Sequence, residues 1–300
     1  MATVAVTGAT GSIGRRVVAA LLERGDRVVA LVRSPPRESL PAEVEQRAWD
    51  ATFKTAGLEG VDAVVHLAGA PVANRRWTEA RKRQIELSRI LGTRSVVSGM
   101  RESAGVRVLV SASGIDYHGD TGDALVTEES PPGKGFLPDL AVRWEQEAEE
   151  ARALGARVVL LRTGLLLARG EGALARMEPI FRAGLGASLG SGAQWVPWIH
   201  WKDEVGLILH ALDRAEVEGP MIAAAPNPVP NREFTRALAE ALGKRPFPIP
   251  APGPALRLLL GELATVVLSS HRTSPEVALR TGYEFRFPEL APALADLYSG

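Results

Sequence analysis

The chain of 300 residues contains no cysteine, which excludes disulfide bridges, a thiolate nucleophile and cysteine-ligated metal sites. It also lacks an excess of either charge, because 35 basic residues balance 35 acidic ones. This balance argues against nucleic acid or an anionic membrane surface as the main partner. No apolar run reaches the roughly 18 residues of a membrane-spanning helix. We therefore expect a cytoplasmic protein with neither nucleic acid nor a membrane as partner.

Metal-ligand patterns are missing as well. The five histidines, His66, His118, His200, His210 and His271, show no spacing typical of metal ligands, so we expect no metal. Hydrophobic residues make up 46% and charged residues 23% of the chain, as in an ordinary globular protein. The length allows one large α/β domain, or a large and a small one.

The opening segment places a glycine-rich turn directly behind an apolar strand. Residues 2–6 predict the strand, and a helix is expected over residues 13–23. Glycines at this turn allow the chain to reverse, to approach a pyrophosphate closely and to pack the helix tightly on the strand. The helix start favours bound phosphate groups. The pattern predicts a nucleotide cofactor site formed by Gly8, Thr10, Gly11, Ser12, Ile13 and Gly14.

Strands and helices alternate along the first half of the chain. Strands are expected at residues 27–32, 61–69, 107–113, 157–162 and 220–225, with long helices at residues 78–101 and 138–154. This order predicts an α/β fold with a Rossmann-type, doubly wound parallel sheet. We expect residues 1–165 and the strand near 220–225 to form the dinucleotide-binding domain. Residues 166–219 and 226–300 would form a smaller C-terminal substrate lobe.

The end of the second strand indicates which dinucleotide binds. Residues 27–32 are followed by Arg33 and Ser34, with no acidic residue to hold the ribose hydroxyls. An arginine there suits a 2′-phosphate, so we expect NADP(H) in preference to NAD(H). A solvated strand-end charge is the alternative for Arg33. Asp50, behind the third strand, is placed either to accept from an adenine amino group or to lie in a surface turn.

These residues carry a resemblance that covers nearly the whole chain. The opening Thr-Gly-x-x-Gly-x-x-Gly, residues 66–69 (His-Leu-Ala-Gly) and residues 161–164 (Leu-Arg-Thr-Gly) resemble the extended or atypical short-chain dehydrogenase/reductase superfamily. Residues 69–89 are similar, more narrowly, to its epimerase/dehydratase-like subfamily of uncharacterised oxidoreductases. That subfamily carries a distinctive small C-terminal region, here residues 246–300.

The resemblance implies a bound nicotinamide dinucleotide and a substrate cleft over the carboxyl ends of the strands. The further cofactor residues that it implies are Leu67, Ala68, Gly69, Arg162, Thr163 and Gly164. Ser111 and Ser113 would lie beside the nicotinamide. The resemblance also implies a possible homodimer, formed through the two long helices at residues 78–101 and 138–154.

The sequence lacks the catalytic pair that is typical of the superfamily. In the superfamily, a Tyr-x-x-x-Lys pair supplies the proton that accompanies hydride transfer. The chain has no such pair at the expected helix, where residues 139–145 read Asp-Leu-Ala-Val-Arg-Trp-Glu. Tyr117 is the best remaining acid/base candidate, with His118 as an alternative and a structural role as the other reading. Ser111 stands at a strand end, where such sheets place their ligands.

Two other segments are candidates for substrate binding. The first is a basic cluster with one tryptophan, in which Asn74, Arg75 and Trp77 lie nearest a strand end. Its other members are Arg76, Arg81, Lys82 and Arg89. It is either a clamp for an anionic group or a solvated helix face. The second is residues 195–203, where Trp198 and His200 either contact substrate or belong to the core, and where Asp203 is expected to cap a helix.

Two functions remain open from the sequence. The first is an NADP(H)-dependent oxidoreductase, or an enzyme similar to nucleotide-sugar epimerases, with an unknown small polar or nucleotide-linked substrate. The second is a dinucleotide-binding sensor or interaction protein with little or no catalysis. The missing Tyr-x-x-x-Lys favours the second reading, whereas the tryptophans and the basic cluster favour the first.

Overall fold

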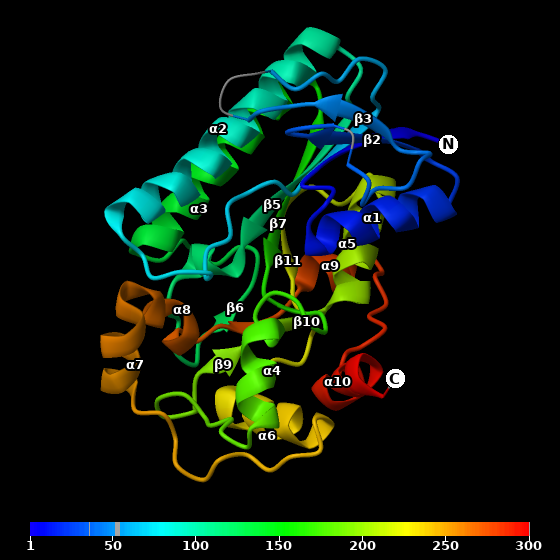
Figure 1. The fold of residues 1–300 in the computed structure, drawn as a ribbon. Coiled ribbons are helices and arrows are strands. Elements are labelled where there is room, and N and C mark those ends of the chain that lie inside the picture. The colour runs from blue at the N-terminus through cyan, green and yellow to red at the C-terminus, as the bar shows by residue number, and fades with distance from the viewer. Residues whose placement is uncertain (36, 52–54, 300) are drawn as a thin grey trace.

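Parallel strands form the centre of the molecule. The structure is a computed structural model, and it describes residues 1–35, 37–51 and 55–299. The described strands form a seven-stranded sheet in the order β11-β7-β5-β4-β1-β2-β3 (Figure 1). They are β1 (Thr3–Thr7), β2 (Arg27–Val32), β3 (Glu45–Ala48), β4 (Ala63–His66), β5 (Val108–Gly114), β7 (Arg157–Thr163) and β11 (Gly219–Ala223). The predicted Rossmann-type α/β fold is confirmed, and the strand expected near residues 220–225 lies beside β7.

Helices cover both faces of the sheet (Figure 1). One face packs against α1 (Ser12–Glu23), α5 (Trp201–Asp213) and α9 (Glu276–Arg280). The other packs against α2 (Glu79–Ser103) and α3 (Phe136–Glu149), which the 3₁₀ turn η2 (Glu150–Leu154) continues. Buried on both sides, central strands such as β2 and β7 are nearly continuous apolar runs. The edge strand β3 is polar and partly exposed.

The start of α1 depends on close packing between backbone segments. A Cβ atom at Gly14 would lie 2.1 Å from the carbonyl oxygen of Gly8, so only glycine permits this approach. From there Val17, Val18 and Leu21 form the buried stripe of the helix. The helix stops before Gly25, whose φ of 85° lies in the left-handed region.

The long helix α2 begins where its capping residue predicts. The Thr78 hydroxyl accepts a hydrogen bond from the Arg81 backbone N–H at 3.2 Å. The helix ends at Ser103, because Ala104 adopts a left-handed conformation with a φ of 42°. The range expected from the sequence, residues 78–101, therefore differs from the structure by one residue at the amino end and two at the carboxyl end.

The remaining elements form a smaller lobe below the carboxyl ends of the sheet strands (Figure 1). Its core joins helices α4, α6 and α10. Its elements are β8 (Leu165–Leu167), α4 (Leu174–Arg182), β9 (Trp195–Val196), β10 (Trp198–His200), β12 (Val229–Pro230), α6 (Asn231–Ala241), α7 (Gly253–Leu260), η3 (Gly261–Leu263), α8 (Ala264–Leu268) and α10 (Leu290–Tyr298). Two short elements follow β5: they are η1 (Ile115–His118) and β6 (Leu125–Val126). The strand β6 pairs with β13 (Arg272–Thr273), which connects this segment to the lobe.

Candidate functional site

A cleft of about 470 Å³ opens at the carboxyl ends of β1, β4, β5 and β7. Parallel sheets bind ligands at this edge, next to the point where the strand order reverses, here between β1 and β4. The predicted site residues that line it are Gly8, Gly11, Ser12, Ile13, Gly14, Leu67, Gly69, Ser113 and Thr163. Its lining also contains Arg89, a member of the predicted basic cluster. It contains, in addition, residues for which the sequence predicted no site role: Asp116, Leu137, Leu140, Ala141, Trp144 and Glu204.

The glycine turn has the geometry of a phosphate cradle. Gly8 has a φ of 67°, and its carbonyl accepts from the Gly11 N–H at 2.9 Å. A Cβ atom at Gly8 would lie 3.0 Å from the Leu67 carbonyl. Gly11 caps α1 without a side-chain hydrogen bond to the first turn. The first backbone N–H groups of the helix therefore point toward the cleft without a capping side chain. Thr10, at the tip of this turn, is exposed.

The end of β2 presents a positive charge to solvent. Arg33 and Ser34 are both exposed and follow the last residue of the strand, Val32. Because no carboxylate stands beside them in the sequence, the pair suits a phosphate group. Asp50 is also exposed, two residues after β3.

A buried hydrogen-bond chain holds the second loop of the cleft. The Thr7 hydroxyl accepts from the backbone N–H groups of Leu67 at 3.0 Å and Ala68 at 3.1 Å, and it lies 2.7 Å from His66 Nδ1. With both acceptor positions used, Thr7 donates its proton to Nδ1. His66 Nε2 then donates to Thr93, at 3.1 Å. Burial lowers the pKa of His66 to about 4, so the ring stays neutral.

The predicted catalytic serine lies behind the cleft, and its neighbour is tied to an ion pair. Ser111 is fully buried and is not among the described lining residues, whereas Ser113 is. The Ser113 hydroxyl donates to Glu145 at 2.6 Å. The same carboxylate receives two hydrogen bonds from Arg162, at 2.9 and 2.8 Å. Arg162 therefore lies in a buried ion pair and not in the cleft lining.

Tyr117 packs against that ion pair. The Arg162 guanidinium carbon lies 3.5 Å from the centre of the Tyr117 ring. Arg162 also lies 3.3 Å from Nε2 of His118. Burial, and then the charge of Arg162, lower the pKa of His118 to about 4. Neither Tyr117 nor His118 is among the described residues that line the cleft, so their placement favours structural roles.

Two charged residues line the cleft beside α3: Arg89, from the predicted basic cluster, and Asp116, for which the sequence predicted no role. Arg89, on α2, donates to the carbonyls of Ala70 at 3.0 Å and Ile85 at 3.2 Å, and it lies 4.9 Å from the centre of the Trp144 ring. Burial lowers its pKa to about 10. Burial raises the pKa of Asp116 to about 6, although the charge of Arg89 opposes that shift. Asp116 can therefore exchange a proton near neutral pH.

At the far side of the cleft stands a fully buried acid. Glu204, on α5, accepts through Oε1 from the Thr163 hydroxyl at 2.8 Å. Its Oε2 atom has no hydrogen-bond partner among the described residues. Burial raises the pKa of this carboxyl to about 8. Gly164 lies outside the described lining, because it packs against Pro197, whose oxygen would be 2.1 Å from an added Cβ.

The predicted substrate residues before α2 lie at the rim. Asn74 accepts from Arg81 at 2.7 Å, and the Trp77 indole donates to the Val72 carbonyl at 2.9 Å. Arg75 is exposed. Val72 itself lines the cleft, but Asn74, Arg75 and Trp77 are not among the described lining residues. These contacts favour a role in holding the rim loop.

The second predicted substrate segment belongs to the lobe core. Trp198 is completely buried and its indole donates to the Asn227 carbonyl at 3.2 Å. His200 is also buried, and its Nδ1 accepts from the Lys202 N–H at 3.2 Å. The expected cap is therefore wrong: His200, and not Asp203, caps α5. Asp203 lies one turn later and accepts instead from the Arg286 and Phe287 backbones, at 2.7 and 3.0 Å.

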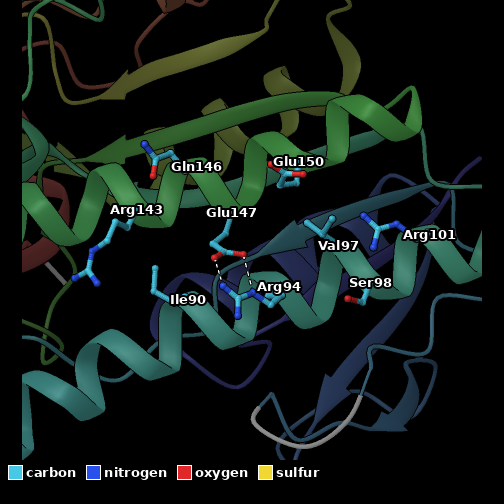
Figure 2. Close-up of a pocket in the computed structure, with 9 residues that line it drawn as sticks. All are labelled: Ile90, Arg94, Val97, Ser98, Arg101, Arg143, Gln146, Glu147 and Glu150. Atoms are coloured by element: carbon cyan, nitrogen blue, oxygen red, sulfur yellow. Dashed lines mark hydrogen bonds and ion pairs between the residues drawn. The ribbon is translucent and has the colours of Figure 1, made fainter.

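A second hollow lies on the outside of the molecule, between α2 and α3. In Figure 2, Arg94 of α2 and Glu147 of α3 point toward each other across it, and they are joined at 3.0 Å. Polar and charged side chains such as Arg101, Gln146 and Glu150 dominate its walls. The homodimer predicted through these helices stays a prediction.

The described residues contain neither a membrane-spanning helix nor a cluster of metal ligands. No helix within residues 1–35, 37–51 and 55–299 has both the length and the apolar character to cross a membrane. Over the same residues, no group of three or more potential ligands is arranged to hold a metal ion.

Comparison with known proteins agrees with this geometry. The NAD dependent epimerase/dehydratase family model matches residues 4–224, and residues 251–297 match a domain of unknown function, DUF1731. The second match falls within the small C-terminal region predicted at residues 246–300. The resemblance inferred from the sequence is therefore confirmed.

Individual relatives cover almost the whole chain. Epimerase family protein Mb2239 of Mycobacterium bovis is 40% identical over 297 residues, which are 98% of this chain and 96% of that protein. The crystal structure of human epimerase family protein SDR39U1 with NADPH has a TM-score of 0.88, at 33% identity and 99% coverage of both chains. A nucleoside-diphosphate sugar epimerase from Corynebacterium glutamicum has a TM-score of 0.81, at 32% identity over 99% of this chain and 58% of that one. With its fold, its glycine cradle and these matches, the chain belongs to the NAD dependent epimerase/dehydratase family.

Proposed function

We propose that the protein binds NADP(H) in the cleft and catalyses hydride transfer to or from a small polar or nucleotide-linked substrate. The observation that carries this proposal is one cleft that combines the phosphate cradle at α1 with two partly buried residues of opposite charge, Arg89 and Asp116. The human relative crystallised with NADPH supports the choice of cofactor, and the relative named as a nucleoside-diphosphate sugar epimerase supports the substrate class.

The residues present fit a dinucleotide phosphate. Backbone N–H groups at Gly11–Gly14 would bind the pyrophosphate, and Arg33 with Ser34 would bind the 2′-phosphate. When bound, the cofactor supplies a hydride at the nicotinamide ring. The Thr7 and His66 hydrogen bonds fix the loop that forms the facing wall of the site.

Asp116 is the proton-transfer group that we assign to this cleft. Its raised pKa of about 6 lies close to neutrality, so it can hold or release a proton at a substrate oxygen. Arg89 would stabilise the charged form and bind an anionic or polar part of the substrate. This proposal assigns to Asp116 the role predicted for Tyr117, because Asp116 lines the cleft.

One observation favours the alternative of a sensor with little catalysis. The face of α3 that meets the cleft is apolar, with Leu137, Leu140, Ala141 and Trp144 in its lining. No tyrosine and lysine pair stands on that face of the described helix, so the acid/base chemistry of the wider superfamily has no counterpart there.

Binding experiments test the cofactor assignment. We expect calorimetry to show tight NADPH binding by the wild-type protein and weak NADH binding. Arg33→Asp should lower NADPH affinity by about 100-fold, because it replaces a phosphate contact with a repulsive charge. The matched control is Arg27→Asp at the other, exposed end of β2, which should leave the affinity unchanged. Equal NADPH affinity in wild type and Arg33→Asp would contradict the 2′-phosphate assignment.

Isotope exchange separates enzyme from sensor. NADPH carrying deuterium at C4 is incubated with a panel of carbonyl compounds, including nucleotide-linked keto sugars. Transfer of deuterium that Asp116→Asn slows at least tenfold, with NADPH affinity retained, would support catalysis. Tight binding without transfer to any compound would favour the sensor.

Location and assembly are separate proposals. We propose a cytoplasmic protein, whereas a relative from Arabidopsis thaliana is named chloroplastic. We propose a homodimer through α2 and α3, which analytical ultracentrifugation tests directly.

A further inference from the structure

Glu204 combines three features that rarely occur together. Its side chain is completely buried, it lines the cofactor cleft, and its Oε2 atom has no hydrogen-bond partner among the described residues. An unpartnered buried acceptor costs free energy, so a native protein normally pairs it with another group or with a ligand. The other oxygen is already satisfied by the Thr163 hydroxyl at 2.8 Å. A ligand group at the cleft wall would complete the pairing.

The order of the strands indicates which part of a dinucleotide reaches Glu204. Arg33 follows β2, the cradle follows β1, and Thr163 ends β7 on the opposite side of the reversal point. A dinucleotide with its pyrophosphate at the cradle and its 2′-phosphate at Arg33 must extend its other half toward β7. The nicotinamide ring would therefore lie beside Thr163 and Glu204, which share the lining of this cleft.

The chemistry of the carboxyl selects a neutral amide as its partner. An anionic group beside Glu204 would be repelled by the carboxylate. A primary amide satisfies Oε2 in either protonation state, because its N–H donates to a carboxylate and its carbonyl accepts from a carboxylic acid. The nicotinamide ring carries such a carboxamide. The raised pKa of Glu204, about 8, means that the acid form dominates at neutral pH and donates to the amide carbonyl.

We infer that Glu204 binds the carboxamide of the nicotinamide ring and thereby orients the ring in the cleft. This inference rests on the proposed binding of NADP(H). It makes Glu204 a cofactor-binding residue with one specific chemical partner, and Thr163 the residue that positions it.

Binding of three ligands to the wild-type protein tests the inference without any substitution. The ligands are NADPH, its 3-acetylpyridine analogue, in which a methyl group replaces the amide nitrogen, and adenosine 2′,5′-bisphosphate, which lacks the ring. A carboxylic acid donating to the carbonyl would tolerate the analogue, while a carboxylate accepting from the amide N–H would not. We therefore expect similar affinities for NADPH and the analogue at pH 6.5, and about tenfold weaker binding of the analogue at pH 9.5.

Two variants then connect this behaviour to Glu204. Glu204→Leu removes the hydrogen bond and should lower NADPH affinity about tenfold, while adenosine 2′,5′-bisphosphate binding stays unchanged and shows that the cradle is intact. Glu204→Gln keeps a donor and an acceptor, so it should retain NADPH affinity within about threefold and lose the pH-dependent discrimination.

The outcomes distinguish the inference from the proposed function. If the wild-type protein binds neither NADPH nor the bisphosphate, the proposed function fails and the inference fails with it. If both bind, but the analogue matches NADPH at both pH values, the inference alone is overturned. The same conclusion follows if Glu204→Leu binds NADPH as tightly as the wild-type protein. Should that variant not fold, the three wild-type measurements and Glu204→Gln still decide the matter.

Discussion

Thr7 and His66 occupy the same row of the sheet, and the threonine hydroxyl oxygen lies 2.7 Å from Nδ1 of the imidazole. The hydroxyl also accepts two backbone N–H groups from the loop that follows β4. One side chain thus links the strand before the cradle to the loop across the cleft. The sheet places these groups in register, although 59 positions separate them along the chain.

Replacing Thr7 by valine keeps the shape of the side chain and removes its hydroxyl. The Ala68 N–H and the imidazole lose their partner, and the Leu67 N–H keeps only its bond to the Thr7 backbone carbonyl at 3.3 Å. We therefore expect the free energy of unfolding to fall by about 3 kcal/mol. Urea denaturation measures the change. Thr265→Val, at an exposed position, is the matched control and should change the free energy of unfolding by less than about 0.5 kcal/mol. Equal losses in both variants would contradict the assigned role of Thr7.

The buried ion pair between Glu145 and Arg162 leads to a second prediction. Glu145→Gln leaves the Arg162 guanidinium buried without a counter-charge, so we expect a loss of about 3 kcal/mol in the free energy of unfolding. Glu147→Gln on the same helix breaks the pair with the exposed Arg94 and should cost less than about 1 kcal/mol. Thermal and chemical denaturation of both variants provide the comparison. A smaller loss at position 145 than at position 147 would contradict this account.

Close packing at the cradle gives a third prediction. Gly14→Ala would place a Cβ atom 2.1 Å from the Gly8 carbonyl oxygen, so the turn and the helix start must move apart. We expect a destabilisation of about 3 kcal/mol and loss of dinucleotide binding. Gly253→Ala, at the start of α7, meets no atom within 4 Å and should shift the free energy of unfolding by no more than about 0.5 kcal/mol. Retained NADPH binding in Gly14→Ala would refute the cradle assignment.

The buried carboxyl of Glu204 predicts a pH dependence of stability. Its pKa in the folded protein, about 8, lies above the ordinary value of 4.5, so the unfolded chain releases this proton first as pH rises. The contribution of Glu204 therefore becomes more destabilising between about pH 4.5 and pH 8, and it levels off above that range.

Glu204→Gln removes this contribution, so its stability relative to the wild-type protein should rise by about 2 kcal/mol or more from pH 5 to pH 8. Urea denaturation of the ligand-free protein at several pH values measures that difference. Glu23→Gln, an exposed position at the end of α1, is the control, and we expect its difference from wild type to stay constant with pH. A constant difference for Glu204→Gln as well would show that the carboxyl is ionised in the folded state.

Part of the site was predictable because its signal is local in the sequence. Gly8, Gly11 and Gly14 act within one turn, so their spacing alone indicates a strand, a tight turn and a helix start. Arg33 directly follows β2, and its position depends only on where that strand ends. In each case neighbours in sequence are neighbours in space.

Other predictions depended on where in the fold a side chain lies and what packs around it. Ser111 and Ser113 lie two residues apart on β5, but only Ser113, nearer the carboxyl end of the strand, is in the described cleft lining. Trp198 and His200 were open to either a site or a core role, and packing against α6 and α10 buried Trp198 in the core of the lobe. The predicted cap of α5 was wrong for a similar reason. Asp203 does not cap the helix, because its carboxylate accepts a hydrogen bond from the Tyr283 hydroxyl, 80 residues later in the chain.

The sequence by itself determined the Rossmann-type fold, the place of the cradle and the family, because each depends on short apolar patterns and on glycines with a local steric role. Only the tertiary structure brought Arg89, Asp116 and Glu204 from three separate elements to one cleft. Their altered pKa values arise from burial, and burial is a property of the assembled chain that no sequence spacing records.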